Sequence, residues 1–206
     1  MMDNIIIRVL TRVFDFIVLN VLWVLCSVPI ITIGASTTAL YSMMLKIVAN
    51  EEGYIIRGFF EDFKKNFRQS TLVWMILVIL GIILGMDFAI LCTAPERVAK
   101  IGNVLLGIVA LFYLSVVSFV FPLIARFENS TFHMIKNAIL IPVSRLPYAC
   151  LVLFTNIICV VLTFLNQMTI VVGAAIWSVI GVALVVYVDS VFIKSMLKPY
   201  GEEQEK

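Results

Sequence analysis

Three aspartates lie within long apolar runs of this chain, and they are the side chains best placed to do chemistry. Asp15 and Asp189 fall near one end of the first and last runs, and Asp87 falls near the opposite end of another. An ionisable group at the centre of a membrane helix costs about 2.5–3.5 kcal/mol on insertion scales, so each aspartate needs an explanation. The simpler explanation is a carboxylate paired or hydrated at the membrane interface. The sharper one is a proton or cation relay through Asp15 and Asp189, although nothing acidic continues that path.

Uncharged polar residues in the same runs, above all Asn20 and Asn156, can line a cavity or hydrogen-bond between helices. Patterns typical of catalysis are missing. The single histidine, His133, has no partner at a readable spacing, and no HExxH, GxSxG or phosphate-binding loop occurs. We therefore expect no catalytic residues, no metal site, no cofactor and no enzymatic activity.

Five apolar runs can each cover about 30 Å of hydrocarbon as a helix, and a sixth run is short. The predicted spans are 13–33, 35–49, 70–92, 102–125, 147–165 and 169–193. The run 35–49 reaches only about 22 Å at the usual helical rise. It must be shielded by neighbouring helices, thin the bilayer, or be a half-span, which leaves five crossings as the alternative. The prediction is an all-α polytopic membrane protein with six transmembrane helices in one integral membrane domain, 1–198, followed by a polar tail, 199–206.

Composition and charge support this prediction and give it a direction. Hydrophobic residues make up 62% of the chain, and only 14% of residues are charged. With six spans, all of the 15 lysines and arginines except Arg97 and Lys100 fall on one side. The positive-inside rule then predicts a multi-pass protein of the cell membrane with both termini cytoplasmic. The bilayer is the expected partner, and a net charge of +2 gives no indication of nucleic-acid binding.

Two short cytoplasmic segments are predicted to form interfacial helices. In the first, four phenylalanines share one helical face and basic residues occupy the other. The aromatic side chains are Phe59, Phe60, Phe63 and Phe67, and the basic ones are Lys64, Lys65 and Arg68. The helix is either a structural element in the headgroup layer or a docking helix for a cytoplasmic partner. The second segment, between the fourth and fifth spans, repeats its Lys-Asn pair, which weakly suggests an internal duplication of the kind common in transporters.

The connection between the first two spans is predicted to be a tight hairpin turn. Pro29 removes a backbone donor and ends the first helix, while Gly34 tolerates the reversal of the chain.

Several of these residues form blocks that resemble a known family. The run Asp15-x4-Asn20-x2-Trp23 and the following SVPIITIGAS, residues 27–36, resemble the N-terminal signature of YesL-like integral membrane proteins. Ala39-Leu40-Tyr41, the segment FFxxFKKNF at 59–67, and FPxxARF at 121–127 match later blocks. The resemblance extends nearly end to end and is most specific in the first third.

The resemblance implies a bacterial membrane protein whose biochemical function is unknown. Genes of this family often lie beside genes for carbohydrate-uptake ABC transporters and sensor kinases. This association implies an accessory or regulatory component of carbohydrate uptake, with ABC transporter subunits as partners, and supplies no catalytic residues. The alternative is a small-molecule transporter that acts alone or as a homodimer.

Overall fold

The computed structural model describes residues 2–51 and 53–201, and these fold into helices joined by short turns, with no strand. The all-α prediction is therefore confirmed. The helices are α1 (Met2–Ser27), a 3₁₀ turn (Ile30–Thr32), α2 (Ile33–Ala49), α3 (Ile55–Thr93), α4 (Glu96–Arg126), α5 (Thr131–Ser144), α6 (Leu146–Thr163), α7 (Gln167–Ile176), a π-helical segment (Trp177–Gly181) and α8 (Val182–Gly201).

Six helical stretches in the described residues are long and apolar enough to cross a membrane, as predicted. They are Val9–Ser27, Ile30–Ala49, Ile55–Thr93, Glu96–Arg126, Leu146–Thr163 and Gln167–Lys198. The last stretch joins α7, the π-helical segment and α8 without a break. The predicted polar tail begins inside α8, which continues to Gly201, and its remainder, 202–206, lies outside the described residues. The chain is thus a multi-pass helical membrane protein.

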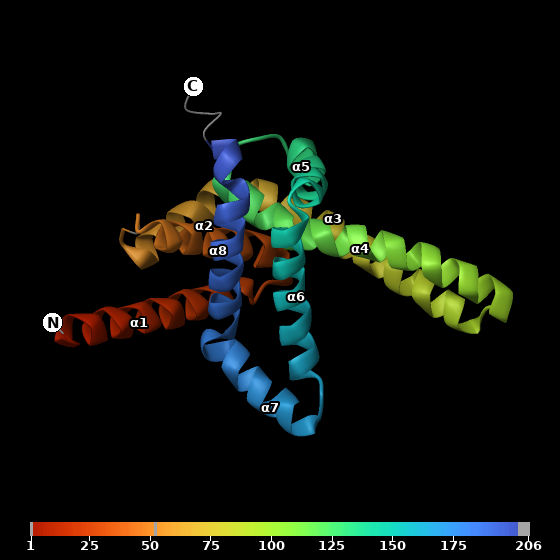
Figure 1. Cartoon of the computed structure of the whole chain (residues 1–206), viewed down its shortest axis with the longest axis horizontal. Coiled ribbons are helices and arrows are strands. Elements are labelled where there is room, and N and C mark those ends of the chain that lie inside the picture. Colours follow the sequence, from red (N-terminus) through yellow and green to blue (C-terminus); the bar gives the residue numbers. More distant parts are fainter. Residues whose placement is uncertain (1, 52, 202–206) are drawn as a thin grey trace.

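The short helix α2 forms the centre of the molecule. Of its apolar stretch 67% is buried, against at most 22% for any other stretch, and it contacts α1, α3, α4 and α8. Figure 1 shows α1, the α3–α4 hairpin and the α6–α7 hairpin leaving this centre in three different directions. Of the three alternatives for so short a helix, the structure therefore shows shielding by its neighbours.

Large apolar side chains cover the outer parts of these arms. On the α3–α4 hairpin, for example, Ile82, Met86, Leu105 and Val109 are more than half exposed. An apolar surface of this extent is not stable in water and is suited to lipid. The cytoplasmic location of both termini stays a prediction from charge.

Of the two predicted short helices, one is a separate helix in the structure and the other is part of a longer helix. The second is a separate helix, α5, between the end of α4 at Arg126 and Pro147 near the start of α6. The first is not separate, because α3 runs as one helix of 39 residues from Ile55 through the predicted span. No proline interrupts this stretch, so nothing ends the helix at the expected boundary near Gln69.

The hairpin connection differs from the prediction in the role of Gly34. Pro29, in an extended conformation (φ −75°), precedes the 3₁₀ turn that joins α1 to α2, as expected for a helix-ending residue. Gly34 instead lies inside α2, and its φ is not positive. A Cβ atom there would lie 2.5 Å from the Ser70 carbonyl oxygen and 2.6 Å from Trp74 Cβ. The glycine therefore permits close approach of α2 and α3 rather than a turn.

Candidate docking face and buried polar cluster

The aromatic face of the predicted docking helix is divided between the core and the surface. Phe59 is 0% exposed and Phe63 is half-buried, and their rings stack with centroids 6.4 Å apart. Gly58, next to Phe59, lies against Met43 of α2. These contacts fix the N-terminal third of α3 on α2, so two of the four phenylalanines stabilise the fold. Phe60 and Phe67 remain 39% and 40% exposed.

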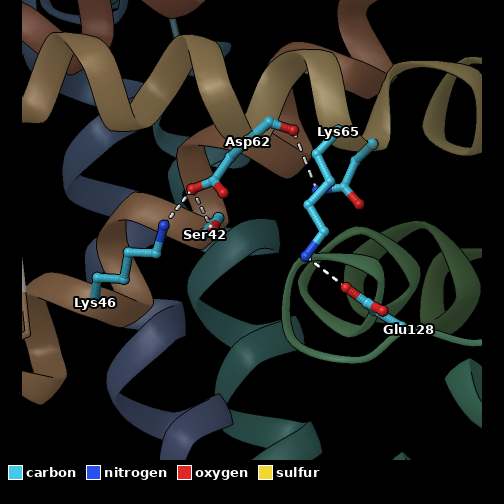
Figure 2. Close-up of polar contacts among 6 residues, drawn as sticks. Ser42, Lys46, Asp62, Lys65 and Glu128 are labelled. Atoms are coloured by element: carbon cyan, nitrogen blue, oxygen red, sulfur yellow. Dashed lines mark hydrogen bonds and ion pairs between the residues drawn. The ribbon is translucent and has the colours of Figure 1, made fainter.

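Part of the charged face is also used within the molecule. Figure 2 shows Asp62 of α3 facing α2, where its Oδ2 accepts hydrogen bonds from Ser42 Oγ at 2.7 Å and Lys46 Nζ at 2.6 Å. Lys65 Nζ reaches Glu128 Oε1, between α4 and α5, at 2.6 Å. The hydrogen bond and positive charge of the Lys65 ammonium lower the pKa of Glu128. Lys65 is thus paired within the molecule, although this ion pair is exposed and contributes little to stability.

What remains of the predicted docking helix is a narrower surface. Phe60, Lys64, Phe67 and Arg68 are exposed and share one side of α3, at i, i+4, i+7 and i+8. The side chains of Lys64 and Arg68 form no hydrogen bond or ion pair with the residues that the structure describes. We call these four residues the docking face. Two aromatic anchors beside two unpaired cations suit a partner surface that is apolar and acidic.

A second candidate site is a polar cluster buried where α2, α6 and α8 meet. Asp189 of α8 is fully buried, and its Oδ2 accepts hydrogen bonds from Asn156 Nδ2 at 2.8 Å and Tyr41 Oη at 3.1 Å. Its Oδ1, like Ser190 Oγ, is buried and has no hydrogen-bond partner among the described residues. The cluster joins three helices and leaves one carboxylate oxygen able to hold a proton or a small cation.

Asn20 serves a different purpose, at the junction of α7 and α8. Its Nδ2 donates to the carbonyl oxygens of Trp177 at 3.1 Å and Ser178 at 2.9 Å, and its Oδ1 accepts from the Ala183 amide at 3.0 Å. The widened π-helical turn changes the backbone hydrogen bonding at this point, and buried backbone groups need partners. Asn20 supplies those partners from α1 and so joins α1 to the π-helical segment and the start of α8.

Of the predicted intramembrane polar residues, Asn156 and Asp189 form a hydrogen bond with each other. Asp87 is exposed on the α3–α4 arm, and Asp15 is half-buried on α1. Tyr41 was not identified from the sequence as a partner of Asp189. The signal that could have found it is the stripe of small and polar residues along α2, which an amphipathic helix in a membrane turns towards protein. No group of three or more metal-ligating side chains occurs among the described residues.

Comparisons with known proteins match the first part of this architecture. Residues 16–88, which contain α2 and most of α3, match the family described as "Protein of unknown function, DUF624". The chain is 24% identical over 140 residues to "Uncharacterized protein YteU" of Bacillus subtilis (strain 168). That alignment covers 66% of this chain and 63% of the relative. No solved structure matches. The sequence is therefore similar in part to a protein family of unknown function and to one uncharacterized bacterial protein.

Proposed function

We propose that this protein is a non-catalytic accessory or regulatory component of a bacterial uptake system, and that it binds its partner through the docking face. The observation that carries the proposal is the pairing of exposed Phe60 and Phe67 with the unpaired cations of Lys64 and Arg68. These side chains stand on a helix that Phe59 and Asp62 already hold against α2, so binding costs little ordering entropy.

The choice of a carbohydrate uptake system rests on the YesL-like resemblance of the sequence. Genes of those proteins often lie beside genes for carbohydrate ABC transporters. The expected partner is therefore a permease or ATPase subunit of such a transporter, with an acidic and apolar patch on its cytoplasmic side. An apolar centre flanked by complementary charge gives both affinity and orientation.

The test is co-purification from mild detergent after co-expression with the carbohydrate ABC transporter subunits of the host. Phe60→Ser with Lys64→Glu should lower the amount of captured transporter by roughly tenfold or more, as for hot-spot residues. The matched control is Phe132→Ser with Lys136→Glu on α5. That pair has the same residue types and spacing and is also exposed.

Folding is checked by size-exclusion chromatography of both variants, since a misfolded chain would lose partners for a trivial reason. The proposal requires that the docking-face variant folds and loses the transporter while the α5 control retains it. Equal capture by both variants, or failure of the wild-type chain to retain any permease or ATPase subunit, would show that this face has no such role.

The second candidate function is transport by the chain itself, and the observation that favours it is the unpartnered Oδ1 of Asp189 at the centre of the helices. A proton or small cation bound there could be coupled to solute movement. Proteoliposomes containing only this protein should then take up sugar along an imposed proton or sodium gradient. Asp189→Asn should abolish that uptake while the protein still folds, and flux that persists in this variant argues against the mechanism.

A further inference from the structure

A basic cavity lies where the C-terminal ends of α2, α4 and α8 come together. It has a volume of about 570 Å³ and is lined by three cationic side chains and one carboxylate. The cations are Arg126, Lys194 and Lys198, and the carboxylate is Glu51. None of the four belongs to the docking face or to the buried polar cluster, so this cavity needs an explanation of its own.

The cations exceed what the fold itself requires at this position. Lys194 Nζ donates to the Val48 carbonyl oxygen at 3.1 Å and so satisfies a group at the end of α2. The partial negative charge of helix C-termini favours such a cation. Arg126 and Lys198, however, form no hydrogen bond or ion pair with the described residues. With Glu51 counted, an excess of positive charge faces the cavity, and the planar guanidinium of Arg126 is suited to a phosphate.

Apart from Ser195, the rest of the cavity wall is apolar. Leu45, Val48, Val191 and Leu197 line it between the charged groups. A free phosphate ion would gain nothing from this wall, whereas the glycerol and upper acyl carbons of a lipid would bury apolar surface against it. All three cations also lie on the side of the chain that the charge distribution assigns to the cytoplasm, where anionic lipids are concentrated.

We infer that this cavity binds the headgroup of an anionic phospholipid, with Arg126 and Lys198 contacting the phosphate and the apolar wall contacting the glycerol and acyl chains. Lys194 keeps the end of α2 in place and adds to the positive potential. Basic pockets between membrane helices on the cytoplasmic side are recurrent sites for such headgroups. This site is independent of the proposed partner docking on α3.

The experiment is native mass spectrometry of the full chain in a neutral detergent, with phosphatidylglycerol or phosphatidylcholine added in equal amounts. Wild type should retain phosphatidylglycerol in clear preference. Arg126→Gln with Lys198→Gln should weaken phosphatidylglycerol binding between about fivefold and 25-fold, taking roughly fivefold for each cation near a membrane surface. Arg97→Gln with Lys100→Gln at the start of α4 removes the same charge far from the cavity and should leave binding unchanged.

Two further variants separate charge from structure. Arg126→Lys with Lys198→Arg keeps both charges and should retain binding. Glu51→Gln removes only the carboxylate and should strengthen binding, a change in the opposite direction that a folding defect cannot produce.

Adding an excess of inorganic phosphate distinguishes a site for the phosphate of a lipid headgroup from a site for a free phosphate ion. Retention of phosphatidylglycerol in its presence supports a lipid site, and displacement by phosphate overturns it in favour of a site for free phosphate. Equal retention of the two lipids, or wild-type binding by the Arg126→Gln, Lys198→Gln protein, likewise overturns the inference.

Discussion

Helices α2 and α3 approach each other closely at Gly34, and this approach offers a sharp test of the packing. A methyl group there would lie 2.5 Å from the Ser70 carbonyl oxygen and 2.6 Å from Trp74 Cβ. Neither atom is the flexible end of a side chain, so α2 and α3 must separate, and overpacking of this kind costs about 1–3 kcal/mol. The backbone itself would not resist the change, because Gly34 is helical and alanine favours a helix by about 1 kcal/mol.

The matched control is Gly85→Ala on α3, where nothing lies within 4 Å of the added methyl group. Both substitutions replace a helical glycine by alanine, so the difference between them reports mainly the overpacking. We expect Gly34→Ala to be less stable than Gly85→Ala by about 1–3 kcal/mol, or several degrees in Tm at roughly 2–4 °C per kcal/mol. The measurement is thermal unfolding in one detergent, followed by size-exclusion chromatography. Equal melting temperatures for the two variants would refute the close contact at Gly34.

Three further predictions concern the polar groups and the topology. Asn20→Leu should destabilise the protein by about 1–3 kcal/mol in thermal unfolding, because it leaves the Trp177, Ser178 and Ala183 backbone groups without their partner. Asn156→Leu should destabilise the protein more than the double change Asn156→Leu with Asp189→Leu, because the single change leaves a buried carboxylate with one donor fewer. If the losses of stability of the two single variants add up to that of the double variant, the two side chains are not directly coupled. In a background without native cysteines, an external thiol reagent should label Pro95→Cys and not Gly53→Cys, and the reverse pattern would contradict cytoplasmic termini.

The sequence was sufficient for the fold class and for the number of apolar stretches, because hydropathy over about 20 residues is a local property. It was not sufficient for the roles of single residues. Gly34 resembled a turn residue because it follows Pro29 closely, yet its function is set by Ser70, which is 36 positions later in the chain. Likewise, periodicity placed Phe59 and Phe60 on one aromatic face, and only packing on α2 shows that the first is buried and the second exposed.

For the charged residues of the candidate sites, too, the sequence does not show which side chains come into contact. Lys64 and Lys65 are adjacent and equivalent in the sequence, but Lys65 alone comes within reach of Glu128, which lies 63 positions away. The three basic residues of the cavity are spread over two helices, and no spacing rule connects Arg126 to Lys194 and Lys198. Contacts of this kind depend on how the helices cross, which a pattern within one helix does not encode.

The position of α2 has a physical explanation, although its low hydropathy makes it the weakest candidate span. Its stretch is the least apolar of the six candidates and is by far the most buried. In lipid, an exposed helix must be apolar on every side, whereas a helix surrounded by protein can place small and polar groups wherever a partner exists. The groups of α2 have such partners: Thr38 bonds Ser70 at 2.8 Å, Tyr41 bonds Asp189, and Ser42 and Lys46 bond Asp62. The features that made 35–49 the weakest predicted span are therefore the ones that place it at the centre.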